Sequence, residues 1–117
     1  MTQTPMTQTL APEALQTEIQ QEIAAHPILV YGKGTAEAPR CGFTLETKTF
    51  FENLGYTATF VDVLENPEKR HVLAQMTDWP TLPKVFIGGQ FYGDTDILAP
   101  MQEKGELEPL LKAAVGG

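Results

Sequence analysis

The sequence contains a single cysteine, Cys41, and its neighbours bear on what chemistry that thiol can do. One cysteine cannot form an intrachain disulfide, so the thiol is either a small buried side chain or a group that reacts outside the chain. Arg40 is adjacent, Lys33 opens the preceding loop, and a helical pattern follows from Thr44. Positive charge and the amides at a helix N-terminus favour a thiolate, which is a nucleophile and a metal ligand. This placement weakens the buried, inert interpretation without excluding it.

The position three residues after Cys41 is Thr44, where a second cysteine would make a dithiol. The segment Cys41-Gly42-Phe43-Thr44 cannot close its own disulfide, so redox chemistry at Cys41 must borrow a second thiol from another molecule. The two histidines, His26 and His71, have no partner at a spacing that indicates a metal site.

The composition limits the function classes. The chain has 117 residues, is 42% hydrophobic and carries a formal net charge of −7, with its basic residues scattered and outnumbered. This length suits one domain, and the charge argues against nucleic acid, which needs a basic surface. No apolar run approaches the roughly 20 residues that span a bilayer, and residues 1–26 lack the Lys and Arg of a targeting segment. We therefore expect a cytoplasmic protein that binds neither nucleic acid nor membranes.

Hydrophobic periodicity and turn residues predict the elements that must position Cys41. The polar residues 1–10 are expected to form a disordered tail, and residues 11–115 a single domain. Helices are predicted at 12–25, 44–54, 66–76, 96–104 and 106–115, and strands at 28–31, 57–63, 84–87 and 90–92. Asn66 is the expected N-cap of the third helix, and Gly88-Gly89 the turn of a hairpin.

This order of elements predicts the fold class. The first two strands, joined through a helix, form a right-handed parallel unit, and a hairpin with further helices follows. We expect an α/β protein with a thioredoxin-like fold, in which helices flank a four-stranded mixed sheet. A fold does not by itself give a function.

Several motifs in register, from about Ile28 to Leu111, resemble the monothiol glutaredoxins of the CGFS type. The motifs are Lys33-Gly34-Thr35, Pro39-x-Cys41-Gly42-Phe43-Thr44, Arg70, Trp79-Pro80-Thr81-Leu82-Pro83, Gly93-x-x-Asp96 and Gly105-Glu106-Leu107. The five-residue loop between Thr35 and Cys41 also has the length typical of that class. Together these motifs outweigh the interpretation of Cys41 as an inert core residue.

The resemblance implies that glutathione binds in a groove beside Cys41. Its glycine carboxylate is expected at Lys33 and Arg70, whose charges suit an anion. Pro83 is expected to be cis and to face the cysteine. The backbone of Leu82 would then pair with the cysteinyl part of glutathione as a strand does.

The γ-glutamyl end of glutathione is expected at the start of a helix, at Thr95 and Asp96. Their N–H groups suit its carboxylate, and the Asp96 side chain suits its amine. A simpler interpretation makes Asp96 the helix N-cap, and both roles can coexist. Trp79 and Phe43 are interpreted as packing residues.

Four residues depart from the pattern of the CGFS type. Thr44 replaces Ser and keeps the hydroxyl, and Ala74 replaces Lys. Asp94 stands where a second Gly is usual, and its carboxylate would repel that of the ligand. Lys84 replaces Gln, and we expect it to restore positive charge.

Two functions remain open, and both use the same groove. Four thiolates usually hold an iron–sulfur cluster, and the resemblance implies a [2Fe–2S] cluster bridged between two protomers by Cys41 and glutathione. BolA-like proteins and apo iron–sulfur acceptor proteins are then the expected partners. The alternative is a glutathione-dependent oxidoreductase that removes glutathione from substrates. A scaffold with a vestigial glutathione site is a third interpretation.

Overall fold

The computed structural model describes residues 12–35, 37–38, 40–64, 66–79 and 81–116. Its elements follow the predicted order: α1 (Pro12–Ala25), β1 (Ile28–Gly32), α2 (Gly42–Asn53), β2 (Thr59–Asp62), α3 (Pro67–Thr77), β3 (Lys84–Ile87), β4 (Gln90–Gly93), α4 (Thr95–Glu103) and α5 (Leu107–Ala114). The expected tail, residues 1–10, lies outside the described residues. Among the helices described, none combines the length and the apolar character that crossing a bilayer requires.

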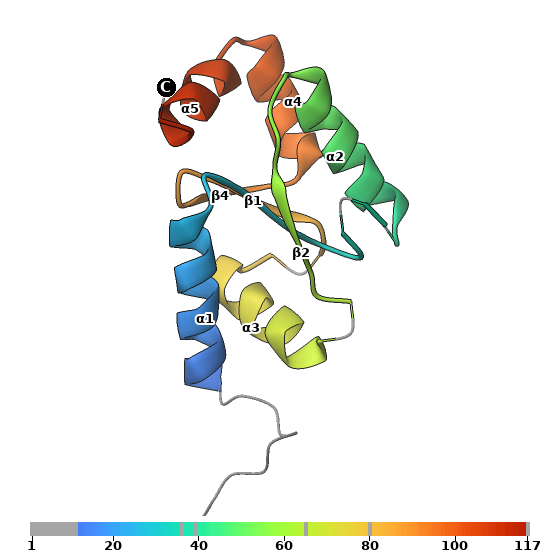
Figure 1. The fold of residues 1–117 in the computed structure, drawn as a ribbon, viewed down its shortest axis with the longest axis vertical. Helices are drawn as coiled ribbons and strands as arrows, with labels where there is room; N and C mark the ends of the chain where they lie inside the picture. Colours follow the sequence, from blue (N-terminus) through green and yellow to red (C-terminus); the bar gives the residue numbers. More distant parts are fainter. Residues whose placement is uncertain (1–11, 36, 39, 65, 80, 117) are drawn as a thin grey trace, which may run out of the picture.

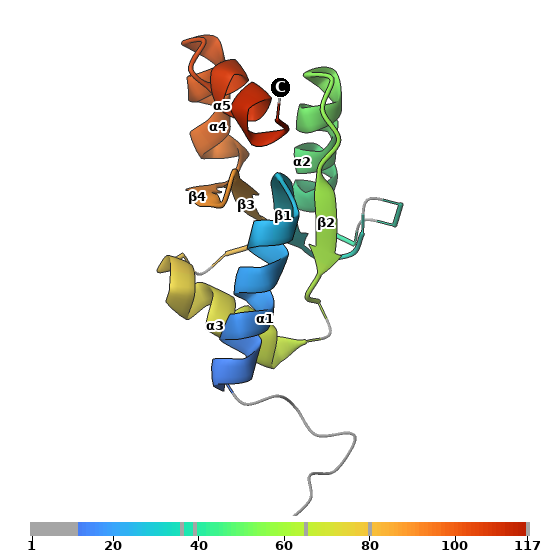
Figure 2. The same cartoon turned by 60° about the vertical axis from the view of Figure 1, so that its left-hand side comes forward.

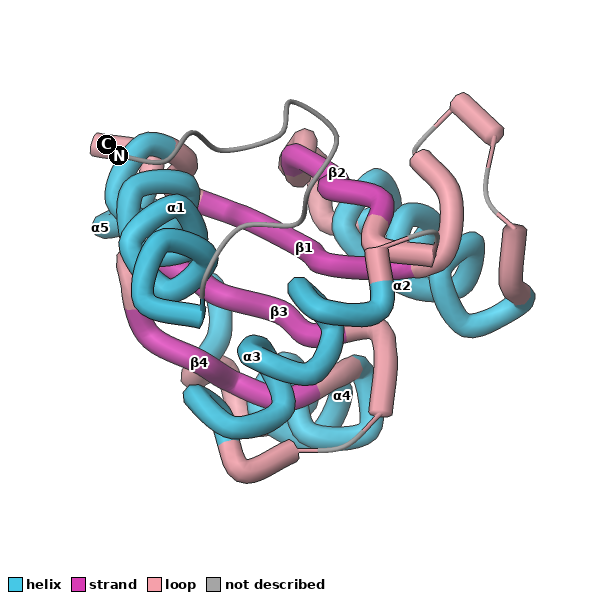
Figure 3. The backbone as a smooth tube through the Cα atoms, turned by 90° about the horizontal axis from the view of Figure 1, so that it is seen from below, coloured by secondary structure: helices cyan, strands magenta, loops and turns pink. Residues whose placement is uncertain are grey.

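The four strands form one mixed sheet in the order β2-β1-β3-β4. β1 pairs parallel with β2 and antiparallel with β3, and β3 pairs antiparallel with β4. α1 and α3 cover one face, and α2, α4 and α5 cover the other (Figures 1 and 2). Viewed from below, α1 and α3 lie across the strands (Figure 3). The predicted thioredoxin-like fold is confirmed.

Alternation along the strands divides the apolar side chains between two cores, one on each face of the sheet. Leu29 and Tyr31 of β1 pack with residues of α1 and α3, whereas Ile28 and Val30 pack with residues of α2, α4 and α5. Both faces of β1 are covered, so all its residues are buried. This burial explains the continuous apolar run in the sequence.

The capping residue of α3 and the hairpin turn agree with the predictions, whereas the bounds of β2 and α2 need correction. Asn66 caps α3 by accepting a hydrogen bond from the N–H of Lys69, as predicted. Both Gly88 and Gly89 have positive φ, as a primed hairpin turn requires. β2 is shorter than the predicted strand 57–63. α2 begins at Gly42 rather than Thr44, because Gly42 and Phe43 are exposed and lie outside the periodic pattern of buried positions that indicated the helix.

A buried lysine joins α1 to α3 and β1. Lys69 is 5% exposed, and its Nζ lies 2.7 Å from Glu18 Oε2 and 2.8 Å from Glu22 Oε2. The Tyr31 hydroxyl donates to Glu22 Oε1 at 2.6 Å, and burial with this bond raises the pKa of Tyr31 far above its ordinary value. The network satisfies an ammonium that would otherwise be costly to bury.

We predict that Lys69→Ala lowers the free energy of unfolding by about 2 kcal/mol or more, because it leaves two carboxylates facing one another without a cation. Lys48→Ala is the matched control, since Lys48 pairs with Glu52 on the surface of one helix. It should cost less than about 0.5 kcal/mol. Urea denaturation of both variants measures the difference, and equal costs would contradict the assigned role of the network.

Candidate thiol and ligand groove

A groove of about 400 Å³ runs beside the cysteine. Its lining combines the end of β1, the start of α2, the first turn of α3, the loop before β3 and the start of α4. The lining residues are Lys33, Cys41, Phe43, Glu46, Arg70, Thr81, Leu82, Pro83, Asp94, Thr95 and Asp96. All six site residues named from the sequence therefore lie in one groove, while their roles toward a ligand stay predictions.

Cys41 occupies the N-cap position of α2 and is partly exposed. The backbone N–H of Thr44 is the main cause that lowers the pKa of the thiol. Partial burial opposes this effect, while the N–H of Phe43, the charge of Lys33 and the Thr44 hydroxyl add to it. The structure thus gives Cys41 the features of an accessible thiolate.

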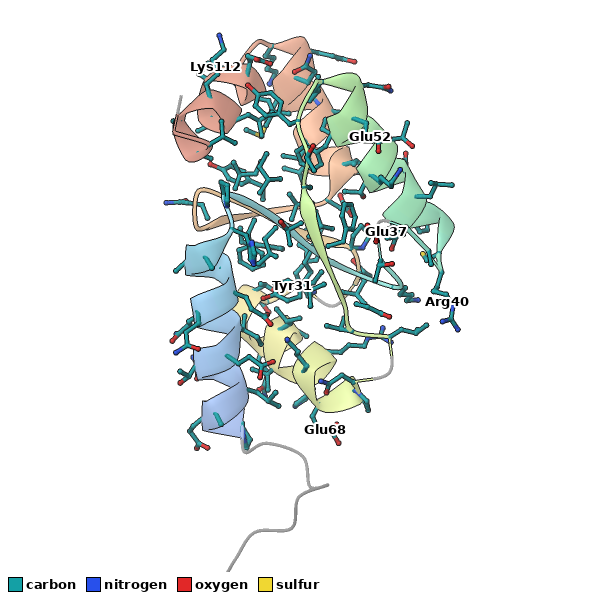
Figure 4. All side chains as sticks on the ribbon, in the orientation of Figure 1. Tyr31, Glu37, Arg40, Glu52, Glu68 and Lys112 are labelled. Carbon is teal, nitrogen blue, oxygen red and sulfur yellow. The ribbon has the colours of Figure 1, made fainter. Side chains whose placement is uncertain are left out.

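Arg40, which is adjacent to Cys41 in the sequence, is not among the causes that lower the pKa of the thiol. Its charge contributes instead to lowering the pKa of Asp62, after the hydrogen bonds from the N–H groups of Leu64 and Gly34. Its side chain points outward at the edge of the molecule (Figure 4). Lys33 is the residue whose charge favours the thiolate of Cys41.

Asp62 anchors the loop before Cys41, a role that the sequence patterns did not reveal. Its Oδ1 accepts from Gly34 N at 3.0 Å and from Leu64 N at 2.8 Å. Gly34 has φ of 88°, and a Cβ there would lie 2.4 Å from the Ala38 carbonyl oxygen, so the position requires glycine. The available signal was the parallel pairing of β1 and β2, because the carboxyl ends of parallel strands meet at one edge.

Thr44 ties the first turn of α2 to the end of β1. Its side chain is buried, and its Oγ1 accepts from the backbone N of Lys33 at 3.1 Å. A Cβ on Gly32 would lie 2.9 Å from this oxygen and 3.1 Å from the methyl carbon of Thr44. The side chain therefore occupies space that the missing side chain of Gly32 leaves free, and the same hydroxyl favours the thiolate.

The loop before β3 forms another wall of the groove. The peptide bond between Leu82 and Pro83 is cis, as the resemblance implied. Both residues line the groove together with Cys41. Trp79 packs edge-on against Phe91, which confirms its packing role.

Asp94, rather than Asp96, is the N-cap of α4. Its Oδ1 accepts from the backbone N of Asp96 at 3.0 Å. The N-cap interpretation of Asp96 is therefore wrong by two positions. The amide that was expected to receive a ligand carboxylate already holds a carboxylate of this chain.

Two further interpretations need correction. Phe43 is 66% exposed and lines the groove, so it is not a packing residue. Lys84 does not add charge at the surface of the groove. It is 1% exposed, and its side chain points into the protein, where it donates hydrogen bonds to backbone carbonyls.

We predict that Thr44→Val raises the pKa of Cys41 while leaving it below that of a free cysteine. The variant removes the hydroxyl, but the backbone N–H of residue 44, the main cause of the lowered pKa, remains. The pH dependence of iodoacetamide alkylation measures the pKa, and its midpoint should move to higher pH. Thr49→Val, on the exposed side of α2, is the control. A midpoint unchanged by Thr44→Val would show that the hydroxyl does not act on the thiol.

Comparisons with known proteins add independent observations. A family model described as Glutaredoxin matches residues 28–92. A protein named probable monothiol glutaredoxin GrlA, from Legionella pneumophila, is 44% identical over 87 residues, which are 74% of this chain and 98% of that protein. Glutaredoxin 4 of Escherichia coli is 38% identical over 95 residues, covering 81% of this chain and 83% of its own.

A solved structure has the same fold. The crystal structure of a buckwheat glutaredoxin–glutathione complex superposes with a TM-score of 0.78 at 25% identity, covering 88% of this chain and 92% of that one. The groove described above, the single cysteine at the N-terminus of α2 and these matches lead to the same conclusion. The chain belongs to the glutaredoxin family, among its monothiol members.

Proposed function

We propose that this protein carries a [2Fe–2S] cluster as cargo, bridged between two protomers by Cys41 of each and by two glutathione molecules. The observation that carries the proposal is a lone, accessible thiol of lowered pKa at the edge of a groove that is cationic at Lys33 and Arg70. Such a thiol is a competent metal ligand, and the groove is large enough for a small ligand beside it.

Ligand counting supports a shared cluster. Iron–sulfur clusters of this type usually take four thiolates. Among the residues that the structure describes, no three His, Cys, Asp or Glu side chains lie together as a metal site. One protomer offers one thiolate, so two protomers and two external thiols complete the set. A cluster held in this way is exposed at an interface, which suits transfer to another protein.

Glutathione fits the groove by charge and by backbone geometry. Lys33 and Arg70 would receive its glycine carboxylate, and the backbone of Leu82 would pair with its cysteinyl unit. The carboxylate of Asp96 would bind its amine, beside the backbone of Thr95. The buckwheat glutaredoxin, which was crystallised as a complex with glutathione, supports this assignment by similarity.

The second candidate is thiol exchange, which the accessible, low-pKa thiol also favours. In that reaction the Cys41 thiolate attacks the glutathione sulfur of a mixed disulfide, and the substrate leaves as a thiolate. A second glutathione thiolate then attacks the Cys41 mixed disulfide, which releases glutathione disulfide and the free thiolate. The reaction needs no second protomer.

The cluster proposal includes partners and a compartment. The cluster-bound form is a homodimer that delivers its cargo to apo iron–sulfur acceptor proteins, and a BolA-like protein is a further proposed partner. The proposed location is the cytoplasm, where thiols are kept reduced.

Anaerobic reconstitution with iron, sulfide and glutathione tests the proposal. We predict that the wild-type protein becomes brown, with visible absorbance of a [2Fe–2S] cluster, and elutes as a dimer. Cys41→Ser should stay colourless and monomeric, because a hydroxyl is a poor ligand at neutral pH. Omitting glutathione should have the same effect. A colourless wild type that still exchanges glutathione with a mixed disulfide would support the oxidoreductase instead.

We predict that Asp94→Gly binds glutathione more tightly than the wild type, by about tenfold or more at low salt. Two like charges about 4 Å apart near a surface repel by about 4 kcal/mol before screening, and removing Asp94 also frees the amide of Asp96. High salt should shrink the gain. Isothermal titration with glutathione measures it, and binding that is unchanged or weaker at low salt would contradict the prediction.

Asp94→Asn is the matched control, because asparagine keeps the N-cap of α4 but removes the charge. If repulsion dominates, Asp94→Asn should gain most of the affinity of Asp94→Gly. If occupation of the Asp96 amide dominates, only Asp94→Gly should gain.

A further inference from the structure

Lys84 lies directly behind the groove, where a charged side chain is unusual. It is the first residue of β3 and follows the Leu82–Pro83 peptide. It pairs with Tyr31 across the antiparallel ladder, so its side chain lies on the sheet face covered by α1 and α3. Only 1% of the residue is exposed.

The ammonium of Lys84 is held by the loop that forms one wall of the groove. Its Nζ donates to the carbonyl oxygen of Thr81 at 2.8 Å and to the carbonyl oxygen of Trp79. Thr81, Leu82 and Pro83 also line the groove. One side chain thus fastens this wall from inside the protein.

We propose that Lys84 is a positioning residue for the ligand groove, and that only its ammonium form holds Trp79 and residues 81–83 in the arrangement that receives a carboxylate-bearing thiol such as glutathione. This inference rests on the proposed use of the groove. A neutral amine has two donor protons and no charge, so it holds two carbonyl oxygens more weakly. Losing the proton would loosen the wall against which the ligand backbone pairs.

The surroundings of Lys84 lower its pKa, so that the ammonium loses its proton closer to neutral pH than an exposed lysine does. Two causes lower the pKa of Lys84 to about 8: burial is the larger, and the charge of Arg70 on α3 is the second. From β1, Tyr31 faces it as a neutral phenol, hydrogen bonded to Glu22 of α1. Tyr92 of β4 packs in the core on the opposite face, and Asp78 after α3 is exposed.

Arg70 couples this proton to the ligand. An anion bound at Arg70 offsets the repulsion between the guanidinium and the ammonium, so it raises the pKa of Lys84. By reciprocity, protonated Lys84 raises the affinity for the anion. Binding is then favoured below the pKa of the free protein, about 8, and weakens as pH rises through it.

The experiment measures binding of S-methylglutathione by isothermal titration from pH 7 to pH 9. This probe has no thiol, and the Cys41→Ser background removes that of the protein. If only the ammonium form binds, the affinity falls about tenfold over this range, in proportion to the protonated fraction. Lys84→Met should bind more weakly at pH 7 and lose the part of the fall between pH 7 and pH 9 that Lys84 causes. Lys84→Arg, which keeps its charge, should flatten the profile while retaining more affinity.

The control is Lys112→Met on the exposed end of α5, which should keep the wild-type profile (Figure 4). Thermal unfolding of each variant establishes that it is folded. A wild-type affinity that is flat from pH 7 to 9, or a Lys84→Met profile identical to the wild type, would overturn the role of Lys84 while leaving the groove intact. Absence of binding by the wild type at every pH would overturn the proposed groove and this inference with it.

Discussion

Burial of β1 on both faces constrains the geometry of the whole groove. Because helices cover both faces, a one-residue shift of β1 would move each of its two apolar sets into the core that is packed for the other set. Its carboxyl end at Gly32 is therefore fixed, and Lys33 follows at once. The parallel partner β2 ends at the same edge, where Asp62 holds the next loop residue, Gly34. The thiol and its nearest cation depend on this one strand end.

The groove derives its chemistry from fixed dipoles and charges on several elements. The start of α2 presents its amides to Cys41, and the start of α4 presents an amide to Asp94. One helix N-terminus thus stabilises the thiolate of Cys41, while the other holds the carboxylate of Asp94. Cations at Lys33 and Arg70 and carboxylates at Asp94 and Asp96 make the groove bipolar. A bound ligand would have to match both signs.

Much of this arrangement was predictable from the sequence, because the strands have strong patterns and the turns have diagnostic residues. The apolar run of β1, the Asn66 cap and the Gly88-Gly89 turn each depend on local chemistry. The six groove residues came from motifs in register with a known family. When motifs occur in the same order as in a family, the chain is expected to share the fold of that family. Each motif residue then has an expected place in that fold.

The errors arose where a role depends on side-chain direction or on distant contacts. Asp94 and Asp96 both suit an N-cap by type, and only the exact helix start separates them. Lys84 looks like a surface cation in sequence, but strand alternation turns it inward beside Tyr31. Asp62 carries no local signal, because its partner Gly34 is 28 residues earlier in the chain.

The contact between Gly32 and Thr44 limits which substitutions the site can accept. Any side chain at position 32 would collide with the hydroxyl and methyl of Thr44, and that hydroxyl also holds the N–H of Lys33. A substitution at position 32 would therefore disturb the hydroxyl that favours the Cys41 thiolate, although Gly32 is not among the residues that line the groove. Positions 32 and 44 are therefore coupled: a larger residue at position 32 would require a smaller one at position 44.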